Sequence, residues 1–316
     1  MLTYFARTAS SAQRKRWIGS ATVDQGFDDR DGMIWFDGAL RPWRETNVHV
    51  LTHAMHYASA VFEGQRAYGG EIFALSQHSE RLINSARILG FEIPWSREQI
   101  DAACRETLAA SGLRDAYMRP LAWRGSEQMG VAAPKSKIHL AIAAWEWGAY
   151  FGAEALAKGL KLEIAPWRRP APFTAPTASK AAGLYMICTM SKHHASDHGY
   201  DDALMLDWRG QVAEATGANV FFVKDGALHT PVPDCFLDGI TRRTVMGLAR
   251  ARGVEVIERA IWPEELEQFE QCFLTGSAAE VVPVGSVGPW RFEVGALTQQ
   301  LMSDYAATVR GHVLNR

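Results

Sequence analysis

The chain has no long apolar segment, few cysteines and no excess of charge of either sign, and each absence excludes a class of protein. No apolar run reaches the roughly 18 residues that a membrane-spanning helix needs. The four cysteines among 316 residues lie far apart and form no C-x-x-C pair. We therefore expect no disulfide, no structural zinc site and no other bound metal, as suits a protein of the reducing cytoplasm. A net charge of -2 gives no electrostatic reason to expect nucleic acid or a membrane surface as a partner.

The composition is that of an ordinary globular protein. It is 47% hydrophobic and 22% charged, and the chain is long enough for two domains with separate cores. Residues 1–32 are different, because a Ser- and Ala-rich segment that contains Arg14-Lys15-Arg16 is followed at once by aspartates. This segment lacks the apolar core of a secretory signal. We predict an N-terminal extension rather than a transit peptide.

Residues 33–146 have the pattern of a small α+β domain. Asp37-Gly38 between apolar runs predicts a hairpin, and the Ser96–Gln99 capping box predicts a helix that ends at Gly112. Residues 116–124 are predicted to form a strand whose period of two places Tyr117 and Arg119 on one face, while Pro120 predicts an edge position or a bulge. The other expected elements are a strand at 71–75, a helix capped by Ser76 that ends at Gly90, and a strand at 138–147.

Residues 147–158 are rich in Gly and Ala and are predicted to connect this domain to a larger one, residues 159–316. Asp225-Gly226 predicts a second hairpin. The mixture of hairpins and helices favours an α+β fold over a doubly wound sheet. The remaining elements expected here are strands at 160–165, 203–207, 254–258 and 272–275 and helices at 181–198, 240–252 and 296–309.

Lys180 lies in the most informative stretch of the chain. A lysine is usually a solvated surface residue, but Lys180 is flanked by alanines, Ser179 and a glycine, whose small side chains allow close approach to the backbone. With Tyr185 and Glu214 following it, the pattern predicts a Schiff-base lysine and pyridoxal phosphate (PLP) as electron sink. Lys180 would be the amine and later the base that moves the substrate proton. Glu214 would keep the pyridine nitrogen protonated.

Two further segments offer groups for the phosphate. Gly239 stands where a helix is expected to begin, and helix N-termini bind phosphate through their free N–H groups. Residues 275–280 end a strand in a Gly-Ser turn with more N–H groups. Arg81 can pair with a phosphate as a charged fork. The Gly239 segment alone is equally consistent with a plain helix cap, and Arg81 alone would be a surface charge.

Taken together and in order, these segments resemble the branched-chain aminotransferase family of fold-type-IV PLP enzymes. The resemblance extends from Ile34 to the C-terminus and implies a two-domain α+β fold with the active site between the domains. The segments that carry it are 53–64, 78–82, 116–120, 147–150, 180–185, 214–219, 237–242 and 275–280.

The resemblance implies a role for each matching residue. Lys180 would form the imine with PLP, Tyr185 would hydrogen-bond the phenolic oxygen of the ring, and Glu214 would face the ring nitrogen. Arg119 would receive the side-chain carboxylate of glutamate. The phosphate would be held by Arg81, Ser277 and the N–H groups of Ile240 and Thr241. The substrate α-carboxylate would be received by Tyr117 and the Ser277–Ala278 backbone, and the apolar pocket would be walled by Tyr57, Phe62, Trp147 and Tyr150.

The expected reaction is ping-pong transamination between L-leucine, L-isoleucine or L-valine and 2-oxoglutarate. The resemblance also implies a homodimer, or an assembly of dimers, in which the loop 124–134 of one subunit borders the other's pocket. A D-amino acid or (R)-amine transaminase and a lyase such as aminodeoxychorismate lyase share this fold and lysine. Tyr117 and Arg119 suit an L-amino acid and glutamate and so favour the first interpretation. A non-catalytic PLP-binding protein would fit loss of Lys180 or Glu214, and both are present.

Overall fold

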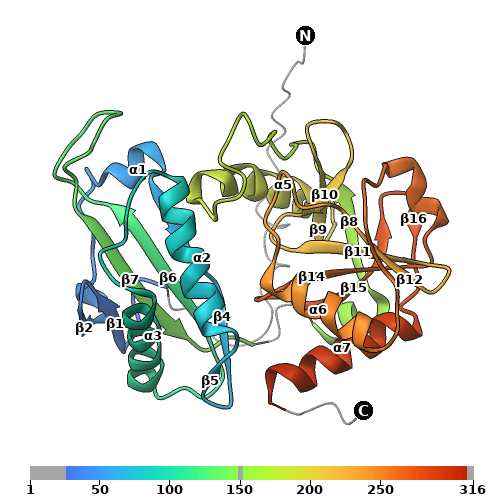
Figure 1. The fold of residues 1–316 in the computed structure, drawn as a ribbon, viewed down its shortest axis with the longest axis horizontal. Helices are drawn as coiled ribbons and strands as arrows, with labels where there is room; N and C mark the ends of the chain where they lie inside the picture. The colour runs from blue at the N-terminus through green and yellow to red at the C-terminus, as the bar shows by residue number, and fades with distance from the viewer. Residues whose placement is uncertain (1–25, 149–151, 312–316) are drawn as a thin grey trace.

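Two separate β-sheets organise the chain in a computed structural model that describes residues 26–148 and 152–311 (Figure 1). The first sheet has the order β2-β1-β7-β6-β4-β5, with β3 also pairing with β6, and forms the N-terminal lobe (residues 26–145). The second has the order β10-β9-β8-β15-β14-β11-β12-β13 and forms the barrel lobe (residues 160–309). The α+β expectation is confirmed.

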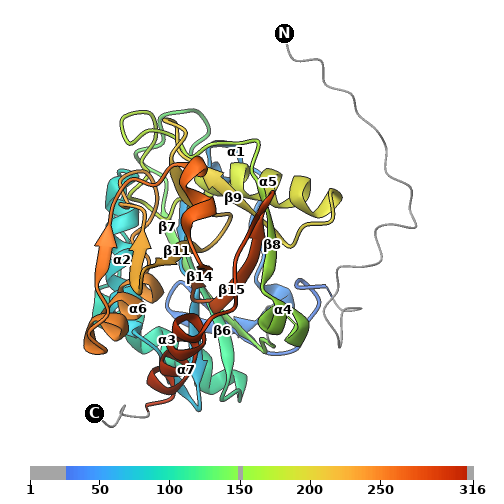
Figure 2. The ribbon, with the colours of Figure 1, turned by 90° about the vertical axis from the view of Figure 1, so that its right-hand side faces the viewer.

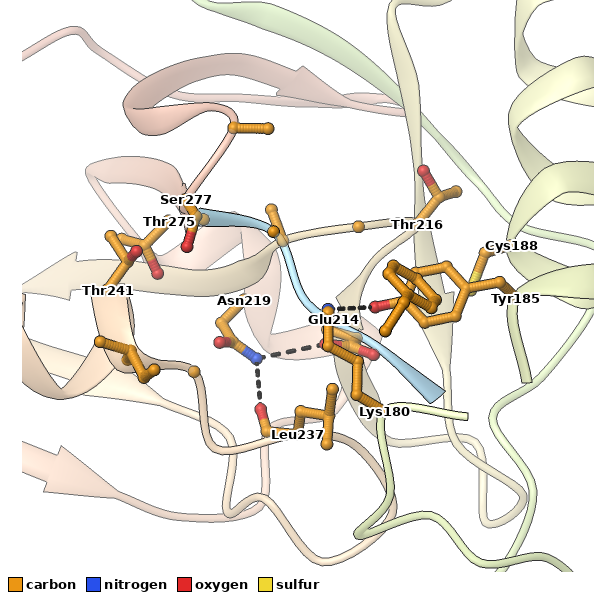
Figure 3. A pocket seen from close by; sticks show the side chains of 18 of the residues that line it. Lys180, Tyr185, Cys188, Glu214, Thr216, Asn219, Leu237, Thr241, Thr275 and Ser277 are labelled. Atoms are coloured by element: carbon orange, nitrogen blue, oxygen red, sulfur yellow. Dashed lines mark hydrogen bonds between the residues drawn. The ribbon is translucent and has the colours of Figure 1, made fainter. Parts of the chain in front are cut away.

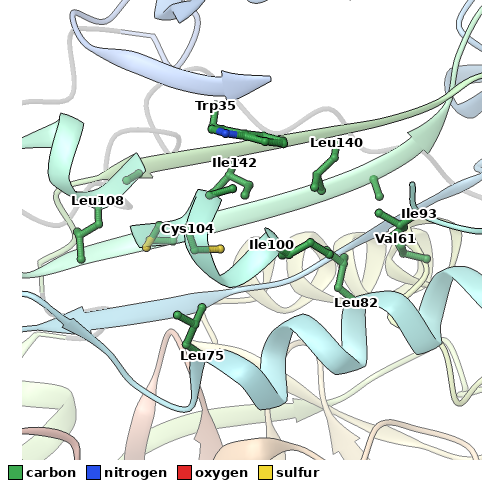
Figure 4. Close-up of a cluster of buried hydrophobic side chains, with 14 of the residues drawn as sticks. Trp35, Val61, Leu75, Leu82, Ile93, Ile100, Cys104, Leu108, Leu140 and Ile142 are labelled. Carbon is green, nitrogen blue, oxygen red and sulfur yellow. The ribbon is translucent and has the colours of Figure 1, made fainter. Parts of the chain in front are cut away.

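The N-terminal lobe is a sheet covered on one face by two helices, α2 and α3. Leu82 of α2 and Ile100 of α3 are fully buried against Leu140 and Ile142 of the sheet (Figure 4). Burial of such side chains stabilises the lobe by roughly 1.5–3 kcal/mol each. The elements are β1 (Met33–Phe36), β2 (Ala39–Pro42), α1 (His53–Tyr57), β3 (Ala60–Phe62), β4 (Gln65–Tyr68), β5 (Glu71–Ile72), α2 (Leu75–Ile88), α3 (Arg97–Ser111), β6 (Ala116–Arg124) and β7 (Ile138–Trp145).

The barrel lobe closes on itself, because β10 pairs with both β9 and β11. Its strands are apolar on both faces: Val220 and Phe222 of β11 point into the barrel core, whereas Phe221 and Val223 pack under α6 and α7. Figure 2 shows α7 and the long paired strands β8 and β15. The elements are α4 (Ala153–Lys158), β8 (Leu160–Ile164), α5 (Met186–Asp197), β9 (Asp202–Leu206), β10 (Val212–Ala215), β11 (Asn219–Lys224), β12 (Ala227–Thr230), α6 (Ile240–Ala251), β13 (Val256–Glu258), β14 (Gln271–Gly276), β15 (Glu280–Val287), β16 (Trp290–Arg291) and α7 (Ala296–Val309).

Two local predictions are wrong, for identifiable reasons. Pro120 lies in the middle of the sheet, with β7 on one side, and on the other side it falls at the break between β3 and β4. Its carbonyl accepts from the N–H of Glu63 at 2.8 Å on that side, so its missing N–H falls at this break rather than within the paired runs of β3 or β4. Ser76 does not cap α2, because Ala74 precedes the helix with φ 51° and the Ser76 hydroxyl donates to Asp101 at 2.6 Å instead.

The last residues of the predicted extension, 26–32, pack against the rest of the N-terminal lobe. Phe27 meets Trp145 edge to face at 5.4 Å, and its carbonyl accepts from the indole N–H of Trp43. Of the predicted connection, residues 149–151 lie outside the described residues and α4 occupies most of the rest. None of the helices that the described residues form is both long enough and apolar enough to span a bilayer.

Candidate active site

A cavity of about 390 Å³ lies between the two lobes. The N-terminal lobe contributes Phe62, Gly64, Arg81, Tyr117 and Arg119, and Trp147 lies two residues beyond its last strand. Lys180 and Tyr185 enter from the segment between β8 and α5, and the barrel lobe contributes Glu214, Asn219, Gly239, Ile240, Thr241, Thr275, Gly276, Ser277 and Ala278, among others. Most of the residues singled out from the sequence therefore converge on one site, from segments far apart in the chain.

Lys180 is held at the junction of the lobes by its own backbone. Its carbonyl accepts from the N–H of Phe62 at 3.2 Å, and its N–H donates to the Ser85 hydroxyl of α2 at 3.0 Å. The side chain then extends into the cavity, where Nζ donates to the Tyr185 hydroxyl at 2.7 Å and lies 5.0 Å from the centroid of the Phe62 ring (Figure 3). Small neighbours on either side let this strand-like segment pack closely. Two backbone contacts and the Tyr185 hydroxyl thus direct the amine into the cavity.

Glu214 stands at the seam where the barrel closes. It is opposite Asn219 in the β10–β11 pair, and the Asn219 amide donates to its carboxylate at 3.2 Å. Burial raises the pKa of Glu214, while the nearby charges of Arg169, whose Nε is 3.4 Å away, and of Lys180 act in the opposite direction. A buried carboxylate so placed favours a second cationic partner inside the cavity, such as a protonated ring nitrogen.

Backbone and hydroxyl groups gather at the other end of the cavity. Figure 3 shows Thr241, Thr275 and Ser277 together there, away from Lys180 and Tyr185. Helix α6 begins at Ile240 without a side-chain cap, so its first N–H groups remain available. A Cβ on Gly239 would lie 2.2 Å from Asn219 Oδ1, so only glycine lets the helix start approach this closely. This end has the features of an anion site.

Arg81 is fixed to the cavity wall by a buried carboxylate. Its guanidinium donates to Glu63 through two bonds, at 2.7 and 2.8 Å, and His78 holds the same carboxylate at 2.7 Å. Burial alone would raise the pKa of Glu63, but the charge of Arg81 and the hydrogen bonds from Arg81 and His78 outweigh it and hold the pKa below its usual range. The fork leaves further guanidinium donors for an anion.

The opposite wall combines aromatic rings with one guanidinium. The Arg119 guanidinium donates to the Tyr117 hydroxyl at 2.8 Å and lies over the Phe62 ring at 4.7 Å. Tyr117 in turn packs against Trp147 at 4.8 Å between ring centroids. Arg119 Nε is buried with no hydrogen-bond partner among the described residues. An apolar wall with a spare buried donor suits a side chain that is either hydrocarbon or carboxylate.

One residue expected in this wall is not brought to it, and another cannot be placed. Tyr57 is 43% exposed and is not among the residues that line the cavity, because its ring packs on His53 at the outer side of α1. Tyr150 lies outside the described residues. Within the described part of one chain, the apolar wall is therefore formed by Phe62, Trp147 and Tyr117.

Several supporting residues were missed by the sequence analysis. Glu63 and His78 orient Arg81, and Arg169 and Asn219 support Glu214. Glu63 and His78 belong to two of the segments on which the resemblance rests. Their residue types and spacing, however, do not predict that they bind Arg81. Arg169 is separated from Glu214 by the whole of α5 and β9.

The groups present fit PLP. The cavity offers an amine, a carboxylate beside it for a ring nitrogen, and N–H and hydroxyl groups at the far end for a phosphate. Thr275 Oγ1 is buried there with no hydrogen-bond partner among the described residues, as expected of an atom that awaits a ligand. A Cβ on Gly276 would lie 3.3 Å from the Gly217 carbonyl, so a larger residue here would crowd the neighbouring turn.

The chain is similar to known aminotransferases over most of its length. A family model described as amino-transferase class IV matches residues 60–287. The probable branched-chain-amino-acid aminotransferase of Rickettsia bellii is 42% identical over 282 residues, which cover 88% of this chain and 96% of the relative.

Solved structures agree with these matches. The branched-chain amino acid aminotransferase of Escherichia coli has a TM-score of 0.87 at 36% identity, covering 91% of this chain and 97% of that one. Two structures of the T.th. branched-chain amino acid aminotransferase, complexed with N-(5'-phosphopyridoxyl)-L-glutamate and with 4-methylvaleric acid, each have a TM-score of 0.85 at 36% identity and cover 90% of this chain and 96% of theirs. With both the sequence and the fold matched over this extent, the chain belongs to the class IV aminotransferase family.

Proposed function

We propose that the protein is a PLP-dependent branched-chain amino acid aminotransferase, exchanging the amino group between L-leucine, L-isoleucine or L-valine and 2-oxoglutarate. The observation that carries the proposal is the cavity itself: the Lys180 amine and the Glu214 carboxylate lie at one end, the α6 N-terminus lies at the other, and Arg119 stands in an aromatic wall. The similar enzymes named above, one of them solved with a glutamate adduct and with a branched acid, support this choice of substrates.

PLP, when bound, supplies the electron sink for the reaction. Lys180 provides the amine that attaches it and then, at Nζ, the base that moves the proton of the substrate α-carbon. The Tyr185 hydroxyl, 2.7 Å from Nζ, orients that amine. Glu214 would stabilise a positive charge at the ring nitrogen, and Arg81, Ser277 and the N–H groups of Ile240 and Thr241 would hold the phosphate.

The two substrates share one pocket in this proposal. The α-carboxylate is received by the Tyr117 hydroxyl and the backbone at Ser277 and Ala278. A branched alkyl chain packs on Phe62 and Trp147, whereas the second carboxylate of glutamate pairs with Arg119. The bond from Arg119 to Tyr117 holds the guanidinium at the edge of the pocket, so that a hydrocarbon side chain can occupy it.

We further propose that the protein works as a homodimer. Exposed apolar side chains gather around α1 and the loop 124–134, which meet where His53 bonds to the carbonyl of Gly130 at 2.8 Å. Val131 is 84% exposed and Met55 is 62% exposed. Monomeric proteins rarely leave such groups of apolar side chains uncovered. Tyr57, on the same surface, would then face a partner chain rather than its own cavity.

One assay distinguishes the candidate enzymes. Purified holoenzyme is incubated with L-leucine, D-alanine or an (R)-amine, each with 2-oxoglutarate, and glutamate formation is measured. We expect turnover with leucine and little with the other two. Preference for D-alanine or the amine would replace this proposal with one of the related transaminases, and turnover of aminodeoxychorismate without 2-oxoglutarate would indicate the lyase.

The lysine assignment has its own test. Borohydride reduction followed by peptide mapping is expected to place the pyridoxyl label on Lys180. Lys180→Ala is expected to retain PLP binding and lose turnover, because the amine would both attach the cofactor and move the substrate proton. A label on Lys192, which also lines the cavity, would overturn the assignment.

A further inference from the structure

A cluster of two histidines and a glutamate lies on the barrel lobe outside the cavity. His194 is in the last turn of α5 and His198 caps that helix, while Glu163 is on β8. Helix α5 packs on β9, the neighbour of β8 in the barrel (Figures 1 and 2). None of the three residues lines the cavity, where the same helix presents Cys188, Thr189, Lys192 and His193.

The three side chains converge on one point. Nδ1 of His194 lies 2.9 Å from the Glu163 carboxylate and Nδ1 of His198 lies 3.3 Å from it. The two imidazole rings are 4.2 Å apart and inclined at 73°, so they meet at the carboxylate without stacking. One ligand atom from each residue lies within 4.8 Å of the other two.

We propose that Glu163, His194 and His198 form a binding site for a divalent first-row transition-metal ion such as Zn²⁺. Bonds of about 2.0–2.2 Å at a tetrahedral ion place neighbouring ligand atoms about 3.4 Å apart, close to the N–O separations of 2.9 and 3.3 Å seen here. Two imidazoles and one carboxylate leave a coordination position for water.

Charge and exposure favour a cation at this place. The site lies at the C-terminus of α5, where the helix dipole attracts positive charge. The side chains are partly exposed, at 22% for Glu163, 41% for His194 and 51% for His198, so an ion can reach them from solvent. Imidazole ligands select transition metals over Mg²⁺ and Ca²⁺, which prefer sites built from oxygen.

A second group of possible metal ligands in the barrel lobe differs from this one. Asp207, Asp234 and Cys235 also bring ligand atoms within 4.8 Å of one another. There, however, Arg209 already pairs with both carboxylates at 2.7 and 2.6 Å, and burial raises the pKa of the Cys235 thiol to about 12. That cluster is neutralised by its own arginine and carries no proposal.

The metal would tie the end of α5 to β8. It would not act in the transamination, since its ligands lie outside the cavity. The expectation of no bound metal rested on the cysteines, which are not ligands here. His194 and His198 stand four residues apart, but their third ligand comes from a strand 31 residues before His194.

The test uses tag-free holoenzyme treated with a chelator and then dialysed. Calorimetric titration with Zn²⁺ is expected to give one ion per chain, and Co²⁺ is expected to produce visible absorption bands. Glu163→Gln and His194→Ala should each weaken Zn²⁺ binding at least tenfold. His49→Ala, which removes an exposed histidine elsewhere, should bind as the original protein does. All three variants should keep their transamination rate with leucine, which reports that they are folded.

Several outcomes would overturn the site. One is equal Zn²⁺ affinity in the original protein and in Glu163→Gln, and another is equal affinity for Mg²⁺ and Zn²⁺. A third is no stoichiometric binding at all, which would leave the three residues as a hydrogen-bonded cluster only. If His194→Ala does not fold, His198→Gln provides the same comparison, and the Co²⁺ bands give a second readout.

Discussion

Arg119 lies where two different side chains must be accommodated in turn. Its guanidinium is held by the Tyr117 hydroxyl at 2.8 Å and by the face of Phe62, while its Nε remains buried without a partner among the described residues. Leucine brings only hydrocarbon to this point, whereas glutamate brings a carboxylate that the guanidinium can pair with.

Arg119→Leu should therefore separate the two half-reactions. We expect kcat/KM for glutamate and 2-oxoglutarate to fall by an amount equivalent to about 2–5 kcal/mol, the scale of leaving a buried charge unpaired. The effect on leucine should be small. The measurement is kcat/KM for each half-reaction, followed through the cofactor absorbance. Equal losses for both substrates would show that Arg119 has no dual-substrate role.

The charge of Glu214, with Arg169 beside it, is the second feature of single residues on which the proposed activity depends. Burial raises the pKa of Glu214, while Arg169 and Lys180 favour its ionised form. Glu214→Gln keeps the shape and the contact with Asn219 but removes the charge. We expect kcat to fall roughly 100-fold or more, the scale of losing one preorganised electrostatic contact.

The fold of Glu214→Gln should be unchanged by circular dichroism. Glu255→Gln, at an exposed glutamate, is the matched control and should turn over normally. Near-normal turnover of Glu214→Gln would reduce Glu214 to a residue that closes the barrel seam.

Helix starts and hairpin turns could be predicted from the sequence where a few neighbouring residues determine them. The Ser96–Gln99 capping box is present at the start of α3, and both Asp-Gly pairs turn hairpins, with φ of 49° and 101° at Asp37-Gly38. Such signals need only the residues they contain. Ser76 does not cap α2, and its hydroxyl instead donates a hydrogen bond to Asp101 of α3. A tertiary contact of that kind is not visible in a local pattern.

Helix α2 carries a titratable group that makes stability depend on pH. Burial lowers the pKa of His78, and although Glu63 acts to raise it, the net shift is downward. The imidazole is therefore neutral in the folded protein at pH 7, whereas an unfolded chain takes up the proton below about pH 6.5. Stability from this group is fully present above that pH and is lost as the pH falls from it towards the folded pKa.

His78→Gln should flatten this dependence. For the unchanged protein we expect the free energy of unfolding to fall between pH 6.5 and 5.5, with up to about 1.4 kcal/mol per pH unit from this one group. Urea unfolding at pH 7.5, 6.5 and 5.5 measures the slope. His229, whose pKa is also lowered by burial, should leave a residual slope, and His49→Gln provides the comparison at an exposed histidine. The same slope in His78→Gln and the original protein would contradict the assignment.

At the scale of the whole molecule, Glu280 connects the two lobes beside the turn that carries Ser277 and Ala278. Glu280 ends the turn 276–279 with φ 58°, a conformation that costs roughly 1–2 kcal/mol for a side-chain-bearing residue. Its carboxylate accepts from the Tyr68 hydroxyl at 2.7 Å and pairs with Arg66 at 3.3 Å, both on β4 of the other lobe. These contacts hold the turn in place across the lobe boundary.

Tyr68→Phe should loosen that turn without disturbing the core. Removing one hydrogen bond to a charged group should lower the free energy of unfolding by about 1.5–3 kcal/mol. KM should rise for leucine and glutamate alike, because Ser277 and Ala278 would receive the common α-carboxylate. Denaturant unfolding and steady-state kinetics measure the two effects. An unchanged KM would mean that the contact only stabilises the lobes.

The arrangement of the lobes was accessible from the sequence only through resemblance. The barrel closes by pairing Glu214 with Asn219 and by the long strand β15, which the apolar pattern did not reveal. Pairing between distant strands is set by the sum of many contacts rather than by any local signal. Individual site residues could be named, but Glu63, His78 and Arg169 emerge only once the sheets bring them to Arg81 and Glu214.

The dimer proposal rests on the exposed apolar surface of α1 and the loop 124–134, and a single charge tests it. Val131→Asp places a carboxylate at its most exposed apolar position, and desolvating that charge would oppose association. We expect sedimentation velocity to show two chains for the original protein and a shift towards monomer for Val131→Asp, with a parallel loss of transamination. Val232→Asp makes the same change at an exposed valine of the barrel lobe and should remain dimeric and active. If the original protein is instead a monomer with full activity at assay concentrations, this surface does not complete the pocket, and each chain works alone.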